Sequence, residues 1–194
     1  METCMDAITS ATSSTDSVEF GRAPSAVPDP AWPMPPQRLA ELELERMAWN
    51  ELTALASTLT TDERMMPGYF SEPPWSVKDL VGHLSAWHVE AREHLLDIGA
   101  NGYLPHDLDV DSRNSQILRR LSGEPWEIVW EEATNARVWM LEAWFRLREP
   151  DDAAAEWVRK AGAEHYAEHL PRLRSWVSEL VELRTRPRVD ERDP

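Results

Sequence analysis

Cysteine, basic side chains and long apolar runs are all scarce in this sequence of 194 residues. Cys4 is its single cysteine, which excludes an intrachain disulfide and a thiolate-rich metal cluster, so a bound metal must be held by nitrogen and oxygen. Twenty basic residues stand against 35 acidic ones, and the net charge of −15 would repel nucleic-acid phosphates and anionic lipids. No stretch approaches the roughly 20 apolar residues that span a bilayer. We therefore expect neither a nucleic-acid nor a membrane partner.

The order of composition along the chain predicts one domain with two polar ends. Residues 1–36 hold six of the fifteen prolines and show no periodicity, which predicts a disordered leader from which Trp32 and Met34 dock on the domain. Residues 184–194 are expected to form a flexible tail, which leaves one domain over 37–183. The first residues lack the basic and apolar segments of a secretory signal, so we expect a cytoplasmic location.

The domain is predicted to be all-α, because segments rich in Leu, Ala, Glu, Arg and Trp alternate with short Pro and Gly interruptions. The clearest start is at Ser76, which can cap a helix and has Asp79 at the third helical position. Four main helices are expected, together with a half-length segment before Gly123 that belongs to one longer crossover; this pattern predicts a four-helix bundle. The four expected helices span 36–59, 76–99, 124–148 and 151–183.

Two of these helices carry histidines that can meet. His165 and His169 lie in the middle of the inward stripe of the last helix, about 6 Å apart along its axis, so that both rings can reach one ion. His83, on the shoulder of the second helix, would add a third nitrogen and leave coordination positions for water or substrate. The alternative is structural: the H-x-x-x-H spacing is common by chance, and each ring could instead bond to a Glu or Tyr nearby. Spacing alone leaves both readings open.

The other histidines are expected to be exposed. His94 shares the face of His83 but lies three turns away, His88 projects to the opposite shoulder, and His106 falls in a loop.

The segments Trp-Ser-Val-Lys-Asp-Leu-Val-Gly-His-Leu-Ser-Ala-Trp (75–87) and Glu-His-Tyr-Ala-Glu-His-Leu (164–170) resemble the DinB/YfiT-like superfamily of four-helix-bundle metalloproteins. This superfamily includes mycothiol- and bacillithiol-dependent S-transferases and the N-terminal domain of mycothiol-dependent maleylpyruvate isomerase. The resemblance covers 37–183 and implies a DinB-like four-helix bundle. It also implies a divalent metal ion (Zn, Ni or Fe) on His83, His165 and His169.

This chain departs from the family pattern in two ways. It has no separate C-terminal domain of the maleylpyruvate isomerase type, which weighs against that particular reaction. Pro171 removes a backbone donor two residues after His169 and could kink the last helix. Self-resistance proteins of the same superfamily share the Ser-Val-Lys-Asp-Leu start but generally lack a histidine where His83 stands, so His83 favours the metal-binding branch.

Two further residues are candidates for substrate binding. Arg137 lies among the tryptophans and methionines of the third helix, where its guanidinium could hold a carboxylate; the alternative is that it pairs with an acid such as Glu45. Trp87, one turn from His83, is expected to wall the pocket as well as the core. Trp139 points away from the stripe of its helix and is expected to be exposed, which predicts a homodimer.

The sequence thus leads to two hypotheses of function. The first, which rests on the resemblance for its thiol, is a metal-dependent thiol S-transferase or hydrolase that detoxifies an electrophilic small molecule, with a low-molecular-weight thiol as cosubstrate. The second is a non-catalytic bundle that sequesters a hydrophobic molecule or a partner protein.

Overall fold

The computed structural model describes residues 33–70, 74–104, 109–147 and 152–186. These residues form α-helices and no β-strand, which confirms the predicted all-α class. The helices are α1 (Pro36–Ser57), α2 (Thr61–Met65), α3 (Val77–Gly99), α4 (Val110–Leu121), α5 (Trp126–Arg146), α6 (Asp152–Ala161) and α7 (Ala163–Thr185).

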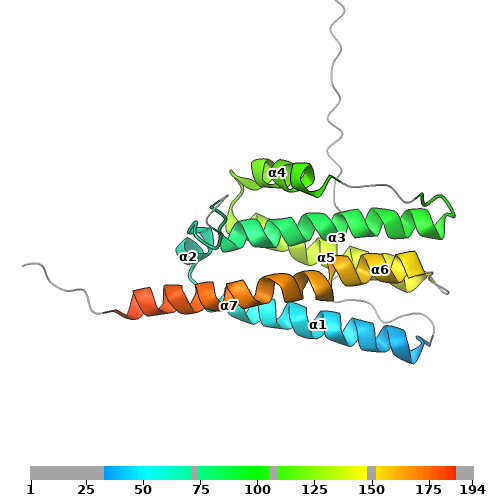
Figure 1. The fold of residues 1–194 in the computed structure, drawn as a ribbon, viewed down its shortest axis with the longest axis horizontal. Coiled ribbons are helices and arrows are strands. Elements are labelled where there is room, and N and C mark those ends of the chain that lie inside the picture. The colour runs from blue at the N-terminus through cyan, green and yellow to red at the C-terminus, as the bar shows by residue number, and fades with distance from the viewer. Residues whose placement is uncertain (1–32, 71–73, 105–108, 148–151, 187–194) are drawn as a thin grey trace, which may run out of the picture.

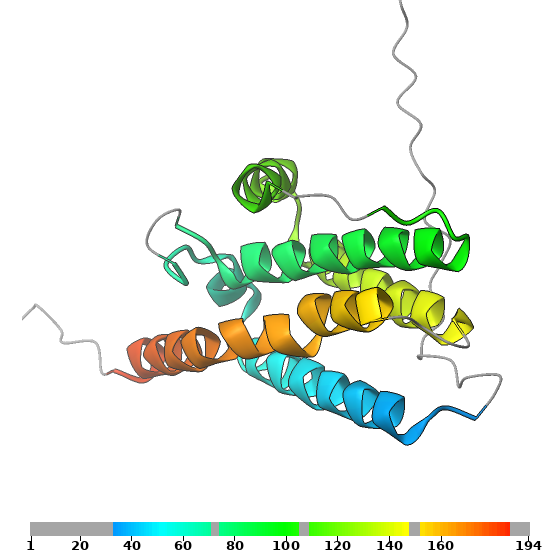
Figure 2. The same cartoon turned by 45° about the vertical axis from the view of Figure 1, so that its right-hand side comes forward.

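The long helices lie side by side, as Figures 1 and 2 show from two directions. α3 packs against α5 and α6, and α1 packs against α7. α4 lies on the outer side of α3, and the short α2 contacts α3 and α5. α1, α3 and α5 correspond to the first three expected helices, and α4 is the expected half-length segment. No helix in the described part of the chain is both long and apolar enough to cross a membrane.

The prediction of one continuous last helix was wrong at Gly162, where α6 and α7 are separated. Gly162 has φ −105° and ψ −111°. A Cβ atom at this position would lie 2.8 Å from the carbonyl oxygen of Val158 and 3.1 Å from Cγ of Glu45 on α1. Glycine therefore permits the close approach of α1 at the junction.

Local capping signals explain where two helices begin. The Ser76 hydroxyl accepts a hydrogen bond from the backbone N–H of Asp79 at 3.2 Å, and Asp79 in turn accepts from the N–H of Ser76 at 2.8 Å, which confirms the predicted capping box. Thr60 and Glu63 form the same reciprocal pair at the start of α2. That short helix was not predicted, although its Thr-x-x-Glu signal is present in the sequence.

The expected ends of the domain differ slightly from the observed ones. Met34 is buried against the domain, as expected, whereas Trp32 and the rest of the leader to residue 32 lie outside the described residues. α7 continues to Thr185, so residues 184 and 185, which were expected to belong to the flexible tail, are part of this helix. Residues 187–194 lie outside the described part of the chain.

A buried cluster of polar side chains joins the four long helical segments. Arg137 on α5 donates two hydrogen bonds of 2.6 Å to the carboxylate of Glu45 on α1. The Tyr166 hydroxyl on α7 donates to the same carboxylate at 3.1 Å, and Nε2 of His88 on α3 lies 2.7 Å from that hydroxyl. The Tyr166 hydroxyl thus bridges the Glu45 carboxylate and the His88 ring.

The position of His88 corrects the expectation that it is exposed. Its side chain is fully buried. Burial lowers the pKa of His88 to about 3, and the nearby His165 and Arg137 add to this effect. Burial also raises the pKa of Tyr166, with a further contribution from the Glu45 carboxylate. The cluster is thus a single buried ion pair, extended by a neutral phenol and a neutral imidazole.

Glu45→Gln is expected to lower the free energy of unfolding by about 3–5 kcal/mol, because it leaves the buried Arg137 guanidinium without a counter-charge. Glu51→Gln, also on α1, is the matched control: it breaks an exposed pair with Arg174 and should cost about 0–1 kcal/mol. Urea denaturation measures both. Equal losses for the two variants would contradict the importance of the buried pair.

Candidate metal centre

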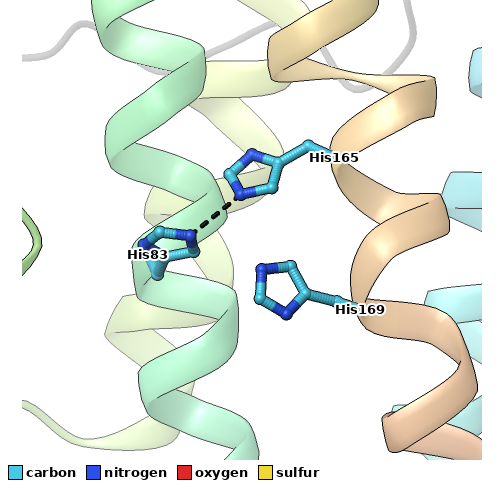
Figure 3. A group of neighbouring side chains, drawn as sticks. All are labelled: His83, His165 and His169. Carbon is cyan, nitrogen blue, oxygen red and sulfur yellow. Dashed lines mark hydrogen bonds between the residues drawn. The ribbon is translucent and has the colours of Figure 1, made fainter. Parts of the chain in front are cut away.

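Three histidines from two facing helices converge at one point, as Figure 3 shows. Nε2 of His83 on α3 lies 2.9 Å from Nε2 of His165 on α7. One nitrogen from each of His83, His165 and His169 lies within 4.8 Å of the other two, so the three rings could hold one metal ion. The structure therefore brings together all three residues that the helical spacing indicated.

A loop before α3 supports the third ligand. The hydroxyl of Tyr69 lies 3.1 Å from Nδ1 of His169 and donates to the backbone carbonyl of the same residue at 3.2 Å. Gly68, with φ of 131°, allows the chain to turn here, and the N–H groups of Gly68 and Tyr69 both donate to the carbonyl oxygen of Trp75. Arg172, one turn after His169, donates to the carbonyl oxygens of Tyr69 and Gly68 at 2.7 and 2.9 Å. The loop is thereby tied to α7.

This arrangement favours one tautomer of His169. With the ring proton on Nδ1, the Tyr69 hydroxyl can accept from Nδ1–H and donate to the backbone carbonyl, whereas the other tautomer allows only one of these two hydrogen bonds. Burial raises the pKa of Tyr69, so the phenol stays protonated. The favoured tautomer has its lone pair on Nε2. A second residue that fixes the ligand tautomer in this way is typical of metal sites.

The electrostatics keep all three rings neutral. Burial lowers the pKa of His83 to about 2, that of His165 to about 3 and that of His169 to about 4. Neighbouring imidazoles lower the pKa of His83 and His165 further, while the side chain of Asn114 acts in the opposite direction at His83. At neutral pH each ring thus keeps the lone pair that a metal ion requires.

The donor set fits a divalent ion. The Nε2 atoms of His83 and His165 lie 2.9 Å apart, so in a hydrogen bond between the two neutral rings one Nε2 donates and only the other uses its lone pair. An ion bound by both rings would use the lone pair of each Nε2. Ligand nitrogens on tetrahedral zinc lie about 3.3 Å apart for bonds of about 2.0–2.1 Å, so only a small adjustment is needed.

The three histidines open into a cavity of about 830 Å³. Trp87 lines it, as expected, together with Phe70, Trp75 and Glu168. Arg137 is not among the lining residues, because its guanidinium is held by the carboxylate of Glu45. Of the two roles considered for Arg137 from the sequence, the structure shows the pairing with Glu45 and not the lining of a substrate site. The aromatic rings give this cavity an apolar wall.

The remaining histidines lie apart from this group. His94 is buried, not exposed as expected, because its ring stacks on Trp157 with centroids 4.1 Å apart. Its Nε2 lies 3.5 Å from the carboxylate of Glu90. His106 lies outside the described residues.

Trp139 is half-buried, which corrects its expected exposure. It lines a second cavity of about 430 Å³ between α3, α4 and α5. The homodimer inferred from Trp139 stays a prediction.

Comparisons with protein-family models, with curated proteins and with solved structures found no match.

The role of Tyr69 was not predicted from the sequence, because this residue lies in a loop without periodicity and meets His169 across 100 positions of the chain. Asn114, Tyr103 and Trp157 were missed for a similar reason, since each reaches the cavity from an element whose place depends on tertiary packing.

Tyr69→Phe is expected to weaken zinc binding by about 10–100-fold, because the His169 ring loses the group that fixes its tautomer. Competition with a chromogenic chelator measures the affinity, and circular dichroism checks that the helices remain. Tyr103→Phe is the matched control, since the Tyr103 hydroxyl accepts from Trp157 and does not touch the three histidines. Wild-type affinity in Tyr69→Phe would refute the supporting role.

Proposed function

We propose that the chain is a DinB-like four-helix-bundle metalloprotein in which His83, His165 and His169 hold a divalent zinc, nickel or iron ion. The observation that carries the proposal is the convergence of three neutral imidazoles beside an aromatic cavity. An ion bound by these residues would act as a Lewis acid that lowers the pKa of a thiol or a water molecule and so makes that molecule a nucleophile at neutral pH. The family resemblance adds the four-helix-bundle architecture, and the cytoplasmic setting is proposed from the N-terminal sequence.

The proposed reaction is transfer of a low-molecular-weight thiol, of the mycothiol type, to an electrophilic small molecule, as in detoxification or self-resistance. The sulfur forms a bond to the electrophilic carbon, and the leaving group departs with the electron pair of its own bond. In the related hydrolase reaction, water takes the place of the thiol. The thiol is proposed from the family resemblance.

Particular residues of this chain would serve this reaction. Glu168 lines the cavity next to His169 in sequence, and no basic side chain of the described residues pairs with it, so its carboxylate is the proposed acceptor of the thiol proton. Trp75 and Trp87 lie on either side of His83, with ring centroids 5.0 and 6.4 Å from the imidazole. They exclude water and offer flat surfaces to an apolar electrophile.

A second candidate function is sequestration without catalysis. It is favoured by the aromatic lining of the cavity, which suits a hydrophobic guest whether or not a reaction follows. A sequestering protein would bind such a guest in a one-to-one complex and leave it unchanged.

The test mixes zinc-loaded protein with a thiol and 1-chloro-2,4-dinitrobenzene and follows formation of the thioether by absorbance. The wild type is expected to accelerate the reaction, and His169→Ala is expected to lose at least about 100-fold in rate, because a metal ligand should matter no less than a residue that supports one. Glu51→Gln changes an exposed side chain that pairs with Arg174 and does not line the cavity, so it should keep the rate. Formation of 2,4-dinitrophenol in the absence of thiol would indicate the hydrolase, and binding without turnover would indicate sequestration.

A further inference from the structure

The cavity continues well beyond the three histidines. Its α6–α7 side includes a row of residues at intervals of four, next to which Glu156, Lys160, Glu164 and Glu168 also line the cavity. The row consists of Ala153, Trp157, Ala161, His165 and His169. The row runs through both helices, from Ala153 and Trp157 on α6 to His165 and His169 on α7. The small side chains of Ala153 and Ala161 leave room along the row. The space is therefore an elongated groove with the candidate metal ligands at one end.

The other end of the groove is a fixed aromatic wall. His94 stacks on one face of the Trp157 indole at an interplanar angle of 25°, and the indole N–H donates to the hydroxyl of Tyr103 at 3.1 Å. The His94 ring is in turn near the buried carboxylate of Glu90. Trp157 and Tyr103 both line the cavity, so their flat surfaces are held in place before any ligand arrives. Such preorganisation lowers the entropic cost of binding a flat group.

The charges at this end do not suit an anion. Among the described lining residues, Lys160 is the only Lys or Arg, and its ammonium is paired with the carboxylate of Glu156. Glu164 also lines the groove and is paired with Arg159. A negatively charged group near Trp157 would have to displace one of these carboxylates, whereas an uncharged aromatic group would only displace water.

We propose that the ligand of this site is an elongated molecule with its reactive group at the three histidines and an uncharged aromatic group against Trp157 and Tyr103. This inference rests on the proposed metal site and adds the class of substrate: an arene, or another flat apolar group, joined by a narrow chain to the reactive centre.

The test uses zinc-loaded protein and three hydroxamates, whose head group binds zinc. Acetohydroxamic acid has no tail, 6-phenylhexanohydroxamic acid has a chain that ends in an arene, and the monohydroxamate of adipic acid has a chain that ends in a carboxylate. Calorimetry is expected to show that the phenyl compound binds at least about tenfold more tightly than acetohydroxamic acid, because its ring is buried in the groove. The carboxylate compound is expected to gain nothing.

Trp157→Ala should remove the advantage of the phenyl compound and leave acetohydroxamic acid unaffected. Trp139→Ala, in the second cavity, is the matched control and should keep the advantage. If Trp157→Ala does not fold, Tyr103→Ala provides the same comparison, and the three ligands on wild-type protein require no variant.

The outcomes separate the two levels of the proposal. If zinc and acetohydroxamic acid bind but the phenyl tail adds no affinity, or adds it equally in Trp157→Ala, the elongated ligand is refuted and the metal site stands. If zinc does not bind, the proposed function fails and the inference fails with it.

Discussion

The Glu45–Arg137 ion pair, with Tyr166 and His88 bonded to it, is the interaction on which the arrangement of the helices depends. Each of the four long helical segments contributes one member, so a shift of any segment would strand a polar group in the core. Burying these groups is costly unless every partner is in place, so other helix rotations that separate the partners are disfavoured. At Gly162, which directly precedes α7, the absence of a side chain allows Glu45 on α1 to pack closely against the backbone.

The same constraint sets the geometry of the histidines. Tyr166 is turned into the core, so His165, its neighbour on α7, is directed toward the flank that faces α3. His169 follows one turn later, and the loop at Tyr69 fixes its tautomer. The rings therefore lie at the boundary between core and cavity, where burial keeps them neutral and the groove leaves them accessible to a ligand. The buried polar cluster and the candidate metal centre thus lie on two different faces of α7.

Local and periodic signals predicted the parts of this protein that depend on neighbours in sequence. The capping box at Ser76 and the i, i+4 pair of His165 and His169 needed only helical geometry, and both were confirmed. His88 was misplaced because its partner is 78 positions away, and a buried imidazole cannot be told from an exposed one without that partner. The helix break at Gly162 was not predicted, since nothing nearby in sequence reveals the approach of α1.

Anomalous diffraction at the zinc edge, from a crystal of the zinc-loaded protein, tests most directly the proposal that three neutral imidazoles on facing helices hold one divalent ion. One ordered peak is expected about 2.0–2.1 Å from the Nε2 atoms of His83, His165 and His169. The absence of an ordered peak there, or a zinc ion held by other residues, would contradict it.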